Sequence, residues 1–196
     1  FTAKDLDENI TLKEFYEINK INLYFYTTEL NNDIMENIEL SHYNNPDLSV
    51  ITALSMSMAI PFVCKPVCNN GKCYIDGGVL NNFPLNDCIT KHKRNQDETL
   101  CFYVKWILEE NINKSIIDDN SNIIDFLFYL LQQMKYKIDT IDPPIEIKNT
   151  IMSKIIYSGN DFSYWKKVVN DEKFRKDIIA IGIEESKLFL KSLEKS

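Results

Sequence analysis

Asp76 is the residue of this chain whose type and surroundings are best suited to chemistry. It follows a strand-like apolar run, Cys73-Tyr74-Ile75, and precedes two glycines, Gly77 and Gly78, that allow the backbone to turn sharply. We therefore expect a carboxylate where a strand ends and a loop begins at the rim of a sheet. Functional residues are often found in such loops, because a rigid scaffold positions them. Such a carboxylate can orient, or deprotonate, a nucleophile supplied from elsewhere.

Several short motifs surround Asp76. In chain order they are Ser57-Met58-Ala59-Ile60-Pro61, Pro66, Asn70-Gly71, Asp76-Gly77-Gly78 and Asn82-Phe83-Pro84. In order and spacing this segment resembles the patatin-like phospholipases. Residues 11–15 and 23–30 look like the helix and strand that precede the segment in that family. The resemblance covers about residues 11–106 and is specific only from residue 57 to residue 84.

The resemblance implies an α/β fold. The expected structure is a patatin-like three-layer α/β/α hydrolase sheet, incomplete at its N-terminal side, with a mainly helical C-terminal region. We expect residues 1–108 to be the downstream part of the catalytic domain and residues 109–196 to pack on it or extend it. Because the chain opens at Phe1 rather than methionine, we expect it to have been processed, truncated or excerpted from something longer.

Three positions depart from the family pattern. Ser55 stands where many members carry arginine, Phe62 where glycine is common, and Glu29 where aspartate is common. These departures concern substrate contacts and local loop geometry, and they leave Asp76 unchanged.

The nucleophile of such enzymes is a serine in G-x-S-x-G, a strained turn that needs glycine on both sides. The glycines here are Gly71, Gly77, Gly78, Gly159 and Gly182, and no two are four positions apart. No glycine precedes Gly71, so a glycine-rich oxyanion loop is missing as well. We therefore expect this chain alone to be inactive.

The resemblance implies a Ser–Asp dyad without histidine, in an intact protein that hydrolyses acyl esters of phospholipids or related lipids. Asp76 would accept the serine proton and return it to the leaving alcohol. An ordinary aspartate, with a pKa of about 3.9, is a weak base, so the complete site must raise it or hold a tight geometry. Gly77 and Gly78 are expected to support the turn, by positive φ angles and by close approach to the nucleophile's turn.

Composition limits the classes of partner. The chain has 196 residues, is 44% hydrophobic and carries a formal net charge of -7. This charge argues against a nucleic-acid partner and gives no electrostatic pull toward anionic membrane surfaces. A lipid-acting protein of this charge would meet a membrane through apolar surface. The longest apolar run, residues 123–131, is interrupted by Asp125 and is far shorter than a membrane-spanning helix. A cytoplasmic or peripheral membrane location is favoured.

The cysteines predict neither a disulfide framework nor a zinc site. There are five of them, an odd number, and none has CxxC spacing, so reduced thiols are the favoured interpretation. One alternative stays open, because a two-residue Asn70-Gly71 turn would place Cys68 opposite Cys73. No metal and no cofactor are expected.

The coarse pattern predicts alternating elements followed by helices. Helices are expected at residues 12–18, from Pro46 to Pro61 and from Pro84; strands at 21–28 and 99–106; a hairpin at 66–75 and a polar connection at 31–45. Beyond residue 109 the periodicity favours helices at 116–136, 145–157 and 162–193, with a break at Asp142-Pro143-Pro144.

Other reactive residues have simpler interpretations. Ser55 and Ser57 lack flanking glycines, so packing or capping is favoured over a nucleophile. His42 in a polar loop and His92 near basic residues are favoured as solvated or dipole-pairing groups.

Two further segments have simple structural interpretations. Residues 126–131 could line an acyl-chain pocket or a membrane-docking face, with helix core as the favoured alternative. The lysines near residues 166–176 are interleaved with acidic residues, which is typical of a solvated helical face.

Two other hypotheses stay open for the whole chain. A catalytically silent patatin-like interaction module would keep the fold and Asp76 without a working serine turn. An unrelated α/β domain would carry the motif by chance and bury Asp76 in a salt bridge.

Overall fold

The computed structural model describes residues 7–108, 117–141, 147–157 and 162–193. Its contacts divide the chain into two compact units, Phe1–Pro84 and Leu85–Ser196, which are described separately below. Both units combine helices with strands, so the expected mixed α/β class is confirmed.

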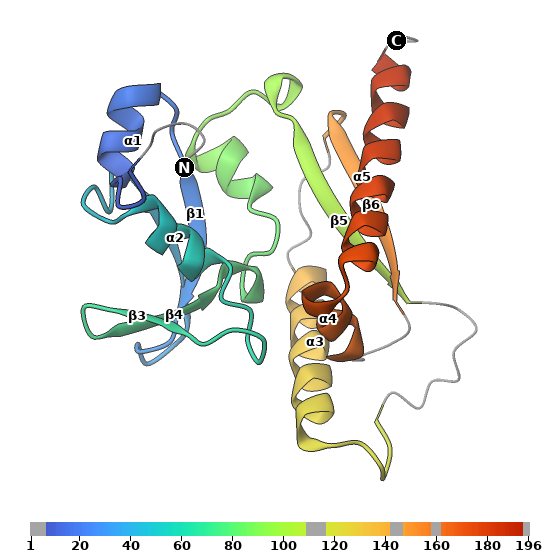
Figure 1. The fold of residues 1–196 in the computed structure, drawn as a ribbon. Helices are drawn as coiled ribbons and strands as arrows, with labels where there is room; N and C mark the ends of the chain where they lie inside the picture. The colour runs from blue at the N-terminus through green and yellow to red at the C-terminus, as the bar shows by residue number, and fades with distance from the viewer. Residues whose placement is uncertain (1–6, 109–116, 142–146, 158–161, 194–196) are drawn as a thin grey trace. The chain divides into compact units, whose positions relative to one another are not determined.

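The first unit contains a four-stranded antiparallel sheet with the order β2-β1-β4-β3 (Figure 1). The strands are β1 (Tyr24–Glu29), β2 (Glu36–Ser41), β3 (Val67–Asn69) and β4 (Lys72–Asp76). Strand β2 corrects the prediction that residues 31–45 are only a polar connection. It pairs with β1 along its whole length, and the alternating Ile38 and Leu40 supply its apolar side chains.

The core of this unit lies between the helices and the sheet. Its helices are α1 (Leu12–Asn19) and α2 (Val50–Ser57), and α2 packs against β1 and β4. The buried cluster consists of Ile10, Leu12, Leu40, Val50, Ala53 and Met56. This cluster fixes α2 against the sheet, and α2 leads directly into the segment that reaches the Asp76 turn.

Side chains at the N-termini set the starts of both helices. The capping box predicted at Thr11 and Glu14 is present, with the Glu14 amide donating to Thr11 Oγ1 at 3.2 Å. The pKa of Glu14 is lowered because its carboxylate accepts hydrogen bonds from the Thr11 backbone and hydroxyl. Ser49, not Pro46, caps α2, since its hydroxyl accepts from the Thr52 amide at 3.1 Å. The helix therefore begins later than the sequence predicts.

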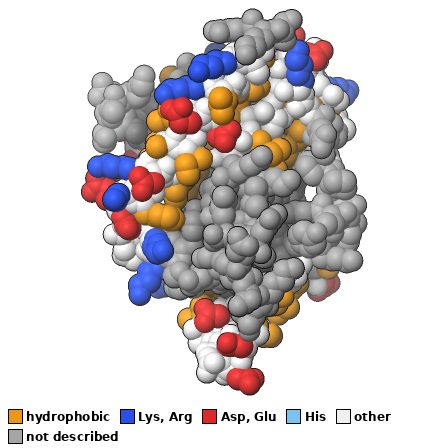
Figure 2. Space-filling view, turned by 90° about the vertical axis from the view of Figure 1, so that its right-hand side faces the viewer, with side chains coloured by type: hydrophobic (Ala, Val, Ile, Leu, Met, Phe, Trp, Pro, Cys, Tyr) orange, Lys and Arg blue, Asp and Glu red, His pale blue; other side chains and the backbone are white. Residues whose placement is uncertain are grey.

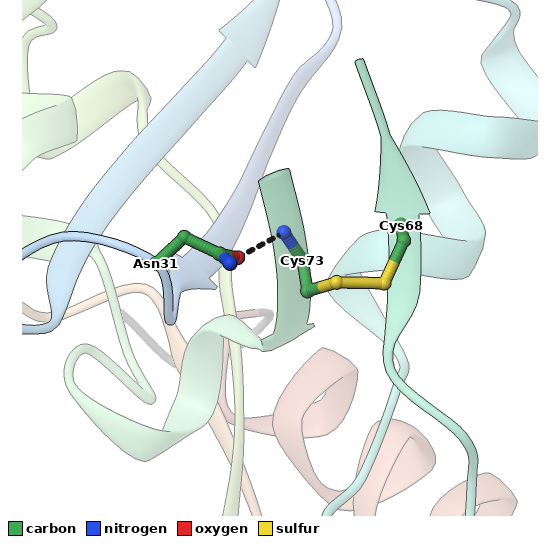
Figure 3. The surroundings of a disulfide bond; sticks show 3 residues. All are labelled: Asn31, Cys68 and Cys73. Atoms are coloured by element: carbon green, nitrogen blue, oxygen red, sulfur yellow. Dashed lines mark hydrogen bonds between the residues drawn. A yellow bond between two sulfur atoms is a disulfide. The ribbon is translucent and has the colours of Figure 1, made fainter. Parts of the chain in front are cut away.

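The β3–β4 hairpin has a two-residue turn, as predicted. Asn70 and Gly71 have φ values of 49° and 77°, the positive pair that a tight hairpin turn of the I′ type requires. The turn sets Cys68 opposite Cys73, and the two form a disulfide (Figure 3). The expectation of reduced thiols is wrong for this pair and holds for Cys64, Cys88 and Cys101. Asn31 also accepts a hydrogen bond from the Cys73 amide, which ties the hairpin to the end of β1.

The second unit contains a two-stranded parallel sheet of β5 (Cys101–Leu108) and β6 (Thr150–Tyr157). Its helices are α3 (Ile123–Ile141), α4 (Phe162–Asn170) and α5 (Glu172–Leu193), and α5 packs on β6 (Figure 1). Before β5 come a π-helical turn, Asp87–Lys91, and a 3-10 turn, Gln96–Glu98. The helix expected from Pro84 is therefore present over residues 85–91, with a π-helical hydrogen-bond pattern from Asp87 onward.

Strand β6 corrects the prediction of a helix at residues 145–157. This stretch is rich in isoleucine and pairs residue by residue with β5, from Cys101 opposite Thr150 to Leu108 opposite Tyr157. The C-terminal region is therefore not helical throughout. The predicted break at Asp142-Pro143-Pro144 lies outside the described residues.

The boundary between compact units also falls earlier than the expected one near residue 109. It lies at Pro84, because β5 pairs with β6 and not with the first sheet. The assignment of residues 1–108 to a catalytic domain and 109–196 to a helical region stays a prediction about the intact protein.

Helix α3 leaves several apolar side chains in solvent. Phe126 and Leu130 are 44% and 43% exposed, so the helix-core interpretation is wrong for these two residues. In the part of the chain that the structure describes, no helix is both long and apolar enough to cross a bilayer.

The disulfide leads to a direct prediction. Denatured, unreduced protein should titrate with three thiols per chain, Cys64, Cys88 and Cys101, whereas fully reduced protein should show five. The Cys68→Ser/Cys73→Ser double variant should give three thiols under both conditions. Five thiols in the unreduced wild-type protein would show that the hairpin cysteines are not linked.

Candidate active site

Asp76 is the last residue of β4, and its backbone is held from two sides. Its amide donates to the Ala59 carbonyl at 3.0 Å, and its carbonyl accepts from the Thr28 hydroxyl at 3.2 Å. Ala59 follows α2, whereas Thr28 lies in the neighbouring strand β1. The end of β4 is therefore fixed to both the helix layer and the sheet.

Thr27 completes this anchoring from the adjacent position in β1. Its hydroxyl lies 2.7 Å from the Ile75 carbonyl oxygen and 3.2 Å from that of Met56, so it bridges β4 and α2. Thr27 and Thr28 are both fully buried. Sequence reasoning missed their role, although two threonines and a glutamate in succession inside an aromatic strand were an available signal.

The Asp76 side chain caps the turn that follows it. The Gly78 amide donates to Asp76 Oδ1 at 2.6 Å, and residues Gly77–Val79 form a single 3-10 turn. The Gly77 carbonyl then accepts from the Leu80 and Asn81 amides, at 3.1 and 2.8 Å. The half-buried carboxyl group is thus held in a fixed orientation at the end of the strand.

Gly77 is required by a close approach of two backbones. A Cβ atom at Gly77 would lie 2.3 Å from the Tyr26 carbonyl oxygen and 2.9 Å from the Thr27 nitrogen. Neither atom can move away without shifting β1, so no larger residue fits. Close approach was expected at this turn, but the partner seen here is β1.

Gly78 has a different role. A Cβ atom there would meet two side-chain oxygens, Asp76 Oδ1 at 2.8 Å and Asn82 Oδ1 at 2.9 Å. Among the described glycines only Gly71 has a positive φ, so the positive φ predicted for Gly77 and Gly78 is wrong. Glycine suits both positions because a Cβ atom would collide with neighbouring atoms, and not because the backbone has a positive φ.

A buried carboxylate lies two positions from this turn across the sheet. Glu29 is 2% exposed and forms an ion pair with Lys72, whose Nζ lies 2.9 Å from Oε1 and 3.0 Å from Oε2. The hydrogen bond to Glu29 raises the pKa of Lys72, and burial raises the pKa of Tyr74 beside it. Glu29 stands where the family commonly has aspartate. Here its carboxylate forms an ion pair that links β1 to β4.

Two other reactive side chains named from the sequence, Ser55 and His42, have structural partners. The Ser55 hydroxyl donates to the Ile51 carbonyl at 2.8 Å within α2. The His42 ring stacks on Tyr16, with centroids 4.0 Å apart and planes 8° apart, so its interpretation as a solvated loop residue is wrong.

Phe62, where the family commonly has glycine, has a φ of 68°. That angle explains why glycine suits the position.

The arrangement offers one oriented carboxylate and no metal site among the described residues. A carboxylate fixed at the end of a strand can hold or receive a proton from a hydroxyl placed beside it. The nucleophile and the oxyanion donors have no counterpart in the glycine pattern of the sequence. What the described residues contribute is therefore a strand-end carboxylate and the turn that orients it.

Replacing single glycines tests whether the backbone approach holds the turn. Gly77→Ala should lower the free energy of unfolding by about 3 kcal/mol, because its new Cβ collides with backbone. Gly78→Ala should cost about 1 kcal/mol, since the ends of side chains can move. Urea unfolding followed by circular dichroism measures both changes.

Gly182→Ala is the matched control. Gly182 lies inside α5, and a Cβ atom added there would have no neighbour within 4 Å, so alanine should stabilise by about 0.5–1 kcal/mol through helix propensity. A Gly77→Ala variant as stable as the wild type would refute the close approach to Tyr26.

Comparisons with known proteins found a matching family model, a similar sequence and a similar fold. The family model described as patatin-like phospholipase matches residues 10–89, which include β1, α2 and the whole Asp76 turn. "Probable lipid hydrolase 463L" of Invertebrate iridescent virus 6 is 30% identical over 134 residues, or 62% of this chain and 43% of that protein.

Among solved structures, the crystal structure of VipD from Legionella pneumophila resembles this chain with a TM-score of 0.54 at 18% identity. The likeness covers 97% of this chain and 37% of that chain, and it shows a shared fold. The chain thus spans less than half the length of each of these two relatives. Residues 10–89 of the chain match the patatin-like phospholipase family, and the viral relative is a probable lipid hydrolase.

Proposed function

We propose that the intact protein carrying this chain is a lipid acyl hydrolase, and that Asp76 is the base of a Ser–Asp dyad. The observation that carries the proposal is the family match over residues 10–89, which includes a strand-end carboxylate fixed by its own turn. The serine and the oxyanion donors would come from polypeptide outside these 196 residues.

The proposed reaction divides ester cleavage into two steps. The serine Oγ attacks the ester carbonyl carbon, its proton passes to the Asp76 carboxylate, and the tetrahedral intermediate expels the alcohol, which takes that proton. Water then attacks the acyl-serine, giving its proton to Asp76, which returns it to the serine as the fatty acid leaves. Asp76 therefore ends each cycle ionised.

Rigidity is what the described turn adds to this chemistry. A carboxylate is a weak base, so the geometry between base and hydroxyl has to be maintained through both proton transfers. The Gly78 amide fixes Oδ1, while the Thr28 hydroxyl and the Ala59 carbonyl fix the backbone on either side. These contacts support a role in which Asp76 moves little during turnover.

A lipid substrate is proposed on the same grounds. The family model names phospholipases, and the viral relative is named a probable lipid hydrolase. The proposed bond is an acyl ester, and the chemistry requires no metal and no cofactor. We make no assignment of head group or acyl position.

Asp76→Asn is the sharpest test of the base. Asparagine keeps a side-chain oxygen that can accept the Gly78 amide, so the turn should persist while proton acceptance is lost. In the intact protein we expect ester hydrolysis to fall by about 10² to 10⁴, measured as kcat/KM on a phospholipid and on a soluble ester.

Asp47→Asn serves as the control, because Asp47 is an exposed aspartate of the same unit and has no place in the turn. It should leave hydrolysis unchanged. An Asp76→Asn protein that is folded and nearly fully active would refute the base assignment. A fluorophosphonate that labels a residue outside a glycine-flanked serine would refute the dyad.

A further inference from the structure

The junction between α4 and α5 forms an open hollow of about 890 Å³ in the second unit. Its lining comes from the end of one helix and the first turns of the next: Lys166, Lys167, Asn170, Asp171, Glu172, Lys173 and Lys176. Among the described residues, four lysines therefore line the hollow together with two acidic residues. This is a local basic surface on a chain whose formal net charge is -7.

Both acidic side chains in the described lining are already used within the protein. Asp171 Oδ1 accepts from the Phe174 amide at 3.0 Å and so caps α5. The Glu172 carboxylate lies 2.7 Å from Lys176 Nζ, one turn along the same helix. Within the described part of the chain, Lys166, Lys167 and Lys173 form no ion pair. Three ammonium groups thus remain available for an external anion.

The junction is also rigid. The Arg175 guanidinium reaches back from α5, and its Nη1 donates to the Val168 and Val169 carbonyls, both at 2.9 Å. The Asp171 amide donates to the Lys167 carbonyl at 2.8 Å. These bonds satisfy the last carbonyls of α4 and fix the angle between the two helices. The backbone that carries these lysines is therefore held in a defined arrangement.

Apolar side chains lie exposed along the same two helices. Val169 in α4 is 62% exposed and Ile179 in α5 is 61% exposed. Ile183 and Leu190 share a helical face with Ile179, since they follow it by one and three turns, and they are 50% and 59% exposed. Figure 2 shows the face that lies on the right-hand side of Figure 1, where α5 is drawn. On this face hydrophobic side chains form a diagonal row beside lysine, arginine and acidic groups.

We propose that the α4–α5 junction docks the protein on membranes that contain anionic lipids. The lysines of the hollow would bind lipid phosphates, and Val169 and Ile179 would enter the interfacial region. The proposal rests on the proposed lipid hydrolase function, because it gives that enzyme a means of meeting its substrate at a bilayer.

The net charge of the chain does not oppose this docking. At physiological ionic strength charges are screened over about 8 Å, so a bilayer senses the surface next to it and not the chain as a whole. Basic groups near an anionic membrane surface each add appreciably to binding within that distance. The local lysines and apolar side chains therefore decide the interaction.

Vesicle co-sedimentation of the intact protein tests the proposal. Vesicles of phosphatidylcholine mixed with phosphatidylserine should bind the wild type, and phosphatidylcholine alone should bind it more weakly. The triple variant Lys166→Gln/Lys167→Gln/Lys173→Gln should lose at least about tenfold in affinity for the mixed vesicles. High salt should weaken the wild type towards the level of the variant.

The matched control is Lys13→Gln/Lys65→Gln/Lys148→Gln, which removes the same charge from exposed lysines elsewhere. It should bind the mixed vesicles like the wild type. Equal losses in both triple variants would indicate a general charge effect and would refute the assigned surface. Equal binding to both kinds of vesicle, or binding of inorganic phosphate without binding of vesicles, would also refute it.

The two proposals can fail independently. Asp76→Asn should bind vesicles as the wild type does, because Asp76 lies in the other compact unit. If Asp76→Asn loses hydrolysis and the variant Lys166→Gln/Lys167→Gln/Lys173→Gln binds vesicles like the wild type, only the docking surface is refuted. If that triple variant loses charge-dependent vesicle binding and Asp76→Asn leaves hydrolysis unchanged, only the dyad is refuted.

Discussion

The structure of the first unit depends on how β1 meets the end of β4. Two buried hydroxyls in succession, on Thr27 and Thr28, donate to the carbonyls of Ile75 and Asp76. A buried hydroxyl that loses its partner costs about 1–3 kcal/mol, so a slip of register would be penalised at both positions. Immediately beyond, the backbone of Gly77 lies against the Tyr26 carbonyl, where no side chain fits. The position of the carboxylate is therefore set by the pairing of strands distant in sequence.

Local signals explain which parts of this arrangement could be predicted. The Asn70-Gly71 turn and the Asp76-Gly77-Gly78 turn have residue types that only a few backbone geometries accept, and the structure has turns at both places. Strand β2 was missed because Ile38 and Leu40 are its only large apolar side chains. The anchoring by Thr27 and Thr28 was missed because its partners lie 48 residues away, beyond any window that periodicity can sense.

Two other errors have different physical causes. The isoleucines of residues 150–157 fit helical and strand spacing alike, and the pairing with β5 decided between them. The Cys68–Cys73 link follows from hairpin register, which the sequence predicts, and from the oxidation state, which it does not. The sequence thus predicted where the two sulfur atoms would meet without predicting their bond.

Local and total charge lead to different conclusions about this chain. A net charge of -7 indicates little long-range attraction to polyanions, and the hollow at the α4–α5 junction is too small to change that. Tight binding to a nucleic acid commonly involves about six to ten phosphate contacts, whereas three unpaired lysines beside exposed valine and isoleucine cannot supply them. A bilayer makes a smaller electrostatic demand, because apolar insertion adds to the attraction. The mixture of basic and apolar groups is therefore in line with the proposed docking on a membrane surface, and the absence of a nucleic-acid partner stays a prediction.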